Sequence, residues 1–539
     1  MFPMLAGLVL RALAATTDRA PANDETAYLQ SGLALLDGRG FTRAGHPELH
    51  FPPLMPVLGG VLAKVTGDPH LAMVLLTLVA SCLLLLPLAW IARRIAGDGA
   101  GDVTAWVAAL MPALSVSLAT KGAGSEAEYL LLVTTALCLV LEAARRTGRG
   151  QLLFVALAGA SIGLAYLTRP EGLLLGFPLG LATLVLAWRA RSSGLRALLL
   201  PLAFGVPVLL GVVPYAAYLH SHTGKWELTA KTQSVSMEAW QAGVRGDRAA
   251  SDAIIYKLDD TGLAIEAKPQ VSLTQLARQD SSGYAAILRE NVEQIRHHVF
   301  DELPHLNHAW ALIPPPVILL ALVALVRRWR SKSMWLVTIL LGTTLLTIGL
   351  FFVQLRYLFL GAALLAVLVG VGLDALRPRW LRTAALVVAM ALLALSSVQG
   401  LKGPQGWMRP TDNNDQRAAG EWLADHLQPG ERIMTRSMVV EFYAGETAMV
   451  IPAGTNGQIL DYARHYGVTY LVVDWTTVHR LRPDLIHLAY HPERYPGVAV
   501  AYETTRDGRR SAILRIDPTG PPDGSTPPMG ALLSFAGDS

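Results

Sequence analysis

The chain has 539 residues, of which 52% are hydrophobic and only 16% are charged, and its mean hydropathy is +0.39. A soluble domain carries about 25% charged residues. The composition therefore excludes an ordinary soluble enzyme and indicates a polytopic membrane protein. The net charge of +4 does not indicate a nucleic-acid partner. The two cysteines, Cys82 and Cys138, lie inside apolar runs, which favours packing over a disulfide framework or a zinc site.

Apolar stretches of about 20 residues cross the hydrocarbon core of a bilayer, and they must be helical because lipid cannot satisfy backbone groups. Residues 2–20 lack a basic leading segment and contain Arg11, so we expect an uncleaved first membrane helix rather than a signal peptide. Eleven helices are predicted in all, near 2–20, 69–92, 103–120, 126–143, 151–168, 171–189, 197–219, 309–327, 333–354, 356–376 and 381–400.

The loops between these segments differ in charge. One alternate set is rich in arginine, whereas the other set of short loops holds only Lys121, Arg169 and Arg356. The positive-inside rule places the arginine-rich set in the cytoplasm. We therefore expect residues 1–400 to form a transmembrane domain. Its N-terminus is then cytoplasmic, and the loop 21–66, the segment 220–308 and the C-terminal region lie outside.

Three regions are not membrane helices. In the first outer loop, residues 25–36 carry apolar side chains at helical spacing, which predicts a helix in the membrane interface. The polar segment 220–308 is predicted to contain short helices near 273–300. Residues 401–516 alternate helical and strand-like patterns, which predicts a small extracytoplasmic α/β domain, and residues 517–539 are predicted to be a disordered tail.

Within residues 401–516 the pattern predicts individual elements. Residues 470–473 form a continuous apolar run, which is typical of a buried parallel strand. The other predicted elements are helices at 415–426 and 459–466, strands at 432–435 and 438–442, and a hairpin of 498–502 with 511–516 around Asp507-Gly508.

The first outer loop begins with Asp24-Glu25, directly after the first apolar segment. A carboxylate at the mouth of a membrane cavity is costly unless it has a partner or a role. Asp24 could accept a proton from an attacking hydroxyl as a general base. The pair could instead hold a divalent cation, or Asp24 could be the N-cap of the following helix.

Glu126 and Glu128 open the predicted helix 126–143. Carboxylates at a helix N-terminus are favoured by the helix dipole, and Ser125 could cap this helix. The functional alternative is a second acidic wall of the same outer cavity.

Isolated cations are scarce on the outer side. A guanidinium binds phosphate oxygens in a bidentate manner, so Arg169, Arg356 and Lys231 are candidates for phosphate contact. Ordinary ion pairing, for example of Arg169 with Glu171, is the alternative for each. The histidines of the segment 220–308 show no metal-ligand spacing, and Arg11 could pair with an acidic residue or extend towards the interface.

The order of these motifs is distinctive. It runs from Asp24-Glu25 with Tyr28, through Pro52-Pro53-Leu54-Met55-Pro56 and Ser125-Glu126, to Leu167-Thr168-Arg169-Pro170-Glu171-Gly172 and Arg356-Tyr357. Over about residues 1–400 the chain resembles the GT-C membrane glycosyltransferases. The similar group is the bacterial family-39-like one, related to protein O-mannosyltransferases and to the aminoarabinose transferases of lipid A.

The resemblance implies transfer of a sugar from a polyprenyl-phosphate donor to an extracytoplasmic glycan, lipid or protein acceptor. It implies that Asp24 is the catalytic base, that Glu25 positions the acceptor or the base, and that Glu126 is the acidic residue of the second outer loop. Arg169, Lys231 and Arg356 would bind the donor phosphate.

The chain also departs from this family. His50-Phe51 replaces the Glu-Lys that precedes Pro-Pro in the aminoarabinose group, and the first loop has no Asp-X-Asp, so a divalent cation is left open. The C-terminal α/β pattern is unlike the β-trefoil of eukaryotic mannosyltransferases. A transporter or flippase of lipid-linked sugars and a non-catalytic membrane scaffold remain alternatives, although the paired hydropathy repeats of a transporter are not seen.

Overall fold

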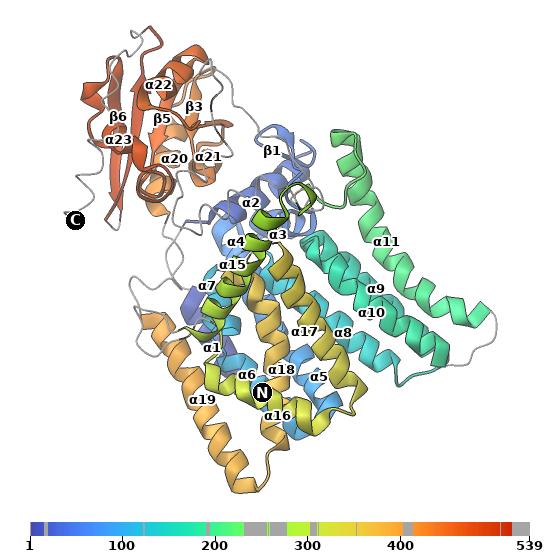
Figure 1. Ribbon diagram of the computed structural model, residues 1–539. Coiled ribbons are helices and arrows are strands. Elements are labelled where there is room, and N and C mark those ends of the chain that lie inside the picture. Colours follow the sequence, from blue (N-terminus) through green and yellow to red (C-terminus); the bar gives the residue numbers. More distant parts are fainter. Residues whose placement is uncertain are drawn as a thin grey trace.

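The structure is a computed structural model that describes residues 2–15, 20–121, 124–189, 195–230, 256, 258, 277–301, 310, 312–351, 353–402, 413–506 and 508–519, with the backbone alone for 23, 120, 121 and 195–197. It consists of a helical bundle with a smaller α/β unit at one end (Figure 1). This unit comprises residues 413–519.

In its described part, each of the eleven predicted segments contains helix. Among the described residues, seven helices are long and apolar enough to cross a membrane by length and composition. The bundle helices are α1 (Phe2–Ala15), α4 (Pro69–Leu83), α5 (Leu85–Ala96), α6 (Asp98–Leu110), α7 (Leu118–Lys121), α8 (Glu126–Ala143), α9 (Gly148–Thr168), α10 (Glu171–Arg189), α11 (Leu195–Thr223), α16 (Pro315–Arg328), α17 (Lys332–Leu350), η2 (Leu355–Leu358), α18 (Phe359–Ala375) and α19 (Arg379–Lys402).

The helix α18 forms the centre of the bundle, because it packs against α5, α6, α16 and α17 and is buried along most of its length. The predicted segment 103–120 is not one continuous helix. It breaks after Leu110 at Met111-Pro112, continues through a π-helical turn (η1, Ala113–Ser117) and ends as α7. Proline lacks a backbone N–H and cannot continue the hydrogen-bond ladder.

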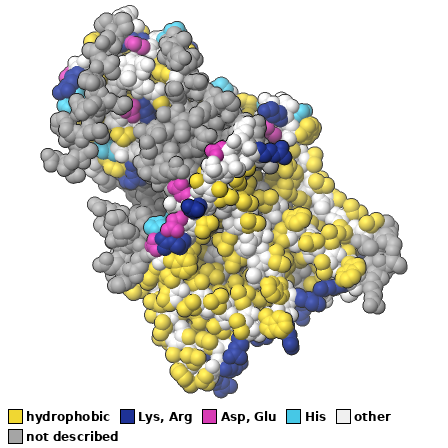
Figure 2. All heavy atoms as spheres, in the orientation of Figure 1, with side chains coloured by type: hydrophobic (Ala, Val, Ile, Leu, Met, Phe, Trp, Pro, Cys, Tyr) yellow, Lys and Arg dark blue, Asp and Glu magenta, His cyan; other side chains and the backbone are white. Residues whose placement is uncertain are grey.

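The surface of the bundle matches a membrane environment. Figure 2 shows a broad hydrophobic band over the helices, with lysine and arginine side chains gathered at the end away from the α/β unit. Large apolar side chains are exposed along this band, including Phe177, Leu210 and Val326. An apolar surface of this extent is not stable in water.

The first loop forms a compact structure above the bundle. It contains α2 (Asn23–Leu36), the short hairpin β1 (Thr42–Arg43) and β2 (His46–Pro47), and α3 (Leu54–Thr66). The helices α2 and α3 cross at Gly32 and Gly60, where a Cβ atom on Gly32 would overlap the carbonyl oxygen of Pro56. The hydroxyl of Tyr218 on α11 donates to the Phe41 carbonyl oxygen over 2.9 Å and thereby anchors the loop.

The helix predicted at 25–36 is confirmed as α2, and a helix predicted within 273–300 is confirmed as α15 (Ser281–Phe300). The interpretation of Asp24 as an N-cap is wrong, because α2 begins at Asn23 and its N-cap is Ala22. The Glu25 carboxylate instead accepts the backbone N–H of Ala22 and so satisfies the start of the helix.

The C-terminal unit contains a five-stranded sheet in the order β4-β3-β5-β7-β6, in which β3 is parallel to β4 and β5, and β7 is antiparallel to β5 and β6. This confirms residues 470–473 as part of a buried parallel strand and confirms the late hairpin, although its turn residue Asp507 lies outside the described residues. The elements are α20 (Asn414–His426), β3 (Arg432–Thr435), α21 (Met438–Ala444), β4 (Ala448–Val450), α22 (Asn456–His465), β5 (Val468–Val473), η3 (Thr477–Leu481), η4 (Pro483–Leu485), α23 (Ile486–Tyr490), η5 (Pro492–Arg494), β6 (Val498–Arg506) and β7 (Arg509–Ile516).

The strand predicted at 438–442 is wrong, since these residues form the helix α21. The side chain of Ser437 accepts the backbone N–H of Val440 over 3.2 Å, and Gly445 ends the helix with a φ of 71°. These two caps explain why an apolar run with strand-like composition becomes a helix.

In such sheets, ligands often bind between the carboxyl ends of neighbouring strands. In this unit, hydrogen-bonded side chains lie at the carboxyl ends of β3 and β5. Gln416 donates to Asp474 over 2.7 Å, and Ser437 donates to Gln416 over 2.7 Å. All three side chains are buried. This buried network therefore stabilises the unit at that edge of the sheet.

Candidate active site

Four charged residues from distant parts of the chain meet where the first loop covers the bundle. Asp24 lies in the first turn of α2, Glu126 begins α8, Arg169 joins α9 to α10, and Arg356 lies in η2 before α18. The structure thus brings together four of the six predicted site residues. Of the other two, Glu25 faces Ala22, and Lys231 lies outside the described residues.

The four charges alternate in sign. Arg356 donates through Nη1 to Asp24 Oδ2 over 2.6 Å, and Arg169 donates through Nη1 to Glu126 Oε1 over 2.6 Å. The Nε atom of Arg356 also lies 3.7 Å from Glu126 Oε1. Glu126 therefore lies between the two guanidinium groups and links the two ion pairs.

The two pairs differ in their access to solvent. The side chains of Asp24 and Arg356 are 35% and 29% exposed, whereas those of Glu126 and Arg169 are 2% and 10% exposed. The Asp24–Arg356 pair consequently forms the open side of the cluster. The Glu126–Arg169 pair forms its closed side, where a charge is stable only with its partner in place.

Aromatic and hydroxyl groups complete the site. The Tyr357 ring lies 4.9 Å from the guanidinium carbon of Arg169 and 5.4 Å from that of Arg356, so one ring contacts both cations. Tyr28, on α2, donates to Ser125 Oγ over 3.3 Å, and Arg169 donates to the same oxygen over 3.4 Å. Ser125 precedes α8 but its side chain does not cap that helix.

Burial, with the nearby carboxylates of Asp24 and Glu126, raises the pKa of the Tyr28 hydroxyl above its usual value, so Tyr28 remains a neutral donor. Sequence reasoning noted Tyr28 and Tyr357 as parts of motifs but gave them no role. The signal for Tyr28 was its spacing from Asp24, because residues four apart lie on one helix face.

The predicted pairing of Arg169 with Glu171 is present, with Nη2 and Oε1 3.7 Å apart, but the contact with Glu126 is shorter. The described residues contain no group of three or more His, Cys, Asp or Glu side chains that could hold a metal ion.

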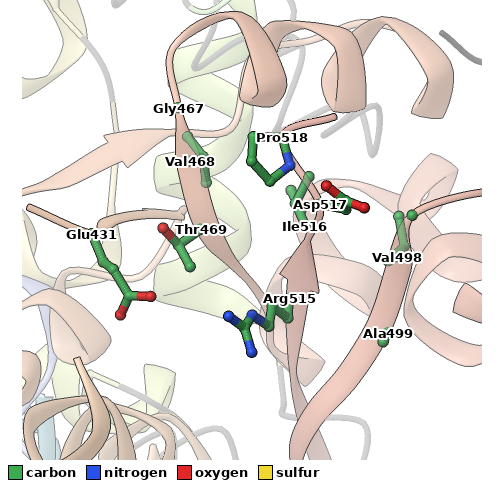
Figure 3. A pocket seen from close by; sticks show the side chains of 11 residues that line it. Glu431, Gly467, Val468, Thr469, Val498, Ala499, Arg515, Ile516, Asp517 and Pro518 are labelled. Carbon is green, nitrogen blue, oxygen red and sulfur yellow. The ribbon is translucent and has the colours of Figure 1, made fainter. Parts of the chain in front are cut away.

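A separate groove of about 630 Å³ lies on the C-terminal unit (Figure 3). Glu431, Thr469 and Arg515 line it, at the edge of the sheet where β5 begins and β7 ends. None of its lining residues belongs to the charged cluster, so the groove and the cluster are distinct features.

The chain was also compared with known families and solved structures. Residues 50–218 match the family described as dolichyl-phosphate-mannose-protein mannosyltransferase. No curated protein is matched.

Solved structures share the fold at low sequence identity. The chain is similar to ArnT from Cupriavidus metallidurans bound to undecaprenyl phosphate, with 15% identity and a TM-score of 0.56, over 96% of this chain and 98% of that one. It is also similar to an oligosaccharyltransferase from Archaeoglobus fulgidus in complex with zinc and sulfate, with 15% identity and a TM-score of 0.55, over 88% of this chain and 68% of that one.

A third similar structure is that of the oligosaccharyltransferase AglB from Archaeoglobus fulgidus in complex with an inhibitory peptide and a dolichol-phosphate. It has 13% identity and a TM-score of 0.53, over 98% of this chain and 75% of that one. The family match covers residues 50–218, and the solved structures show that the chain shares their fold.

Proposed function

We propose that this protein transfers a sugar from a polyprenyl-phosphate carrier to a hydroxyl of an envelope glycan, lipid or protein. The observation that carries the proposal is the 2.6 Å contact between Asp24 and Arg356, which are 332 residues apart in the chain. This contact places a carboxylate that can accept a proton beside a cation that can hold a phosphate, at the open side of the cluster.

In the proposed reaction the acceptor hydroxyl loses its proton to Asp24 as its oxygen attacks the anomeric carbon. The bond from that carbon to the phosphate oxygen breaks, the configuration inverts, and polyprenyl phosphate leaves with the bonding electrons. Arg356 stabilises the negative charge that develops on the leaving phosphate. Each step uses side chains of this chain.

The other predicted residues have supporting roles in this proposal. Glu25 fixes the start of α2 and so positions Asp24. Glu126 holds Arg169 and lies between both guanidinium groups. Because Arg169 is buried against Glu126, we assign direct phosphate contact to Arg356 and long-range charge stabilisation to Arg169. Lys231 is retained as a further phosphate ligand.

The proposed carrier is supported by the solved structures, since the ArnT structure holds undecaprenyl phosphate and the AglB structure holds a dolichol-phosphate. We further propose that the cluster and the C-terminal unit, with residues 401–516 as its domain and 517–539 as a tail, face the extracytoplasmic side. The concentration of basic side chains at the opposite end of the bundle supports this orientation in a bacterial cytoplasmic membrane (Figure 2).

The test uses the purified protein in liposomes with a panel of labelled polyprenyl-phosphate sugars and an envelope acceptor extract. The proposal predicts cleavage of the glycosyl bond and release of unglycosylated carrier phosphate. Movement of the intact lipid across the bilayer without cleavage would identify a flippase. If the folded protein shows neither cleavage nor movement, a scaffold role is favoured.

A further inference from the structure

The base and the phosphate ligand proposed above are bound to each other in the structure. We propose that the donor phosphate competes with Asp24 for Arg356, so that donor binding itself releases Asp24 to act as the base. This inference rests on the proposed function and adds an order of events to it: donor first, then activation of the acceptor.

The closed side of the cluster cannot supply the phosphate ligand without disruption. Arg169 is 10% exposed and donates to both Glu126 and Ser125, while its guanidinium also contacts Tyr357. Opening a buried ion pair leaves an uncompensated charge in a place that water does not reach, which is strongly unfavourable. An incoming phosphate therefore meets Arg356 first.

Two nitrogen atoms of Arg356 already donate to other side chains of the protein. Its Nη1 donates to Asp24 over 2.6 Å, and its Nε donates to Gln354 over 2.7 Å. The Gln354 contact and the nearby Glu126 fix the plane of the guanidinium group. A phosphate that takes the bidentate geometry preferred by arginine needs two neighbouring N–H groups on this open side. On the open side these include Nη1, for which the phosphate then competes with Asp24.

The exposure of Asp24 makes this exchange feasible. Its side chain is 35% exposed, so the carboxylate can turn towards solvent or towards an acceptor hydroxyl without entering an apolar environment. A carboxylate that is bound by arginine is a weaker proton acceptor than a free one. The ion pair therefore keeps the base inactive until a phosphate is in place, which would prevent acceptor activation at an empty donor site.

The apparent affinity of a ligand falls with the fraction of protein in the binding-competent state. If Asp24 occupies Arg356 most of the time, Asp24→Asn should bind undecaprenyl phosphate about tenfold more tightly than the wild type. The experiment titrates undecaprenyl phosphate into each purified protein in detergent micelles by calorimetry. It needs no sugar and no turnover, so it is independent of catalysis.

Three controls make the result specific. Asp37→Asn removes a carboxylate from the far end of α2, where Asp37 is paired with Lys64, and should leave affinity unchanged within twofold. Undecaprenol lacks the phosphate, so Asp24→Asn should bind it no more tightly than the wild type does. In an Arg356→Gln background, Asp24→Asn should not change the affinity for undecaprenyl phosphate. If Asp24 weakened binding by general charge repulsion instead, Asp24→Asn would still raise the affinity in that background.

The outcomes separate this inference from the proposed function. Tighter binding that depends on Arg356 supports the competition. Equal or weaker binding by Asp24→Asn, with undecaprenyl phosphate still bound by the wild type, overturns the competition alone. Weaker binding would further mean that Asp24 orients Arg356 for the ligand. Absence of binding to the folded wild type overturns both the competition and the proposed function.

Discussion

The side-chain amide of Asn413 donates to the carbonyl oxygen of Pro21 over 3.3 Å, which links the start of the C-terminal α/β unit to the residues just before Asp24. The helix α21 extends this contact, because Met438 and Phe442 pack against the apolar cluster formed by the first loop and α4. The unit therefore bears directly on α2, the helix that carries Asp24.

We expect Phe442→Ala to reduce the transfer rate more than it reduces donor affinity. Loss of the aromatic contact loosens α2 at the end that holds Asp24, while the cations that bind the phosphate stay in place. Val500→Ala on β6, at an exposed position of the same unit, is the matched control. Steady-state kinetics and amide hydrogen exchange of α2 provide the measurements, and equal effects of the two variants would contradict the prediction.

The same contact should depend on pH through Glu441, which lies on α21. Burial raises the pKa of Glu441 from 4.5 to about 7, although the charge of Arg43 opposes this shift. A raised pKa means that the folded state binds the proton more tightly than the unfolded state does. The contribution of Glu441 to the free energy of unfolding is therefore full below about pH 4.5 and is lost as the pH rises through about 7.

Thermal unfolding at pH 5 and pH 8 measures this dependence. The wild type should have the higher Tm at pH 5, and Glu441→Gln should reduce the difference because the neutral amide resembles the protonated acid. A difference that is unchanged in Glu441→Gln would assign the pH dependence to other groups.

Close approach of α2 to α3 gives a third prediction. A Cβ atom on Gly32 would overlap the backbone of Pro56, so Gly32→Ala should push the two helices apart. Overpacking of this kind costs about 1–3 kcal/mol. Gly342→Ala in α17 meets no atom within 4 Å and should be neutral. Comparison of the two Tm values tests this prediction. A Gly32→Ala protein with the Tm of the wild type would show that the helices cross less closely.

Removal of Glu126 should affect both stability and activity. Glu126→Gln leaves the buried Arg169 without its closest carboxylate, which should cost about 3–5 kcal/mol. Glu142→Gln is the control, because Glu142 pairs with Arg94 and Arg146 away from the cluster. Both variants should lower the Tm, but only Glu126→Gln should lower turnover per folded molecule. Full specific activity in Glu126→Gln would remove Glu126 from the site.

Much of the fold could be predicted from the sequence because its signals are local. Apolar length identified the bundle helices, and helical spacing in residues 25–36 identified α2. Local pattern failed at 438–442, where the caps at Ser437 and Gly445 outweigh strand-like composition. It also failed at Asp24, for which an N-cap role was plausible. The Glu25 carboxylate instead accepts the backbone N–H of Ala22 at the start of the helix.

The candidate site could be predicted only as a set of residues. Carboxylates and arginines on the same side of the bundle could be recognised from loop charge, but their pairing could not. The contact of Asp24 with Arg356 depends on the packing of α2 over η2, which no local pattern encodes. The distinction between the open Asp24–Arg356 pair and the closed Glu126–Arg169 pair likewise depends on burial.

The most direct test of the account is the rate of carrier-phosphate release by Asp24→Asn, measured at saturating donor beside the wild type and Asp37→Asn. General-base catalysis contributes on the order of 10²–10⁴ in rate, so Asp24→Asn should be slower by about that factor while Asp37→Asn matches the wild type. Release by Asp24→Asn at the wild-type rate would contradict the assignment of the base and leave Glu126 as the next carboxylate to test.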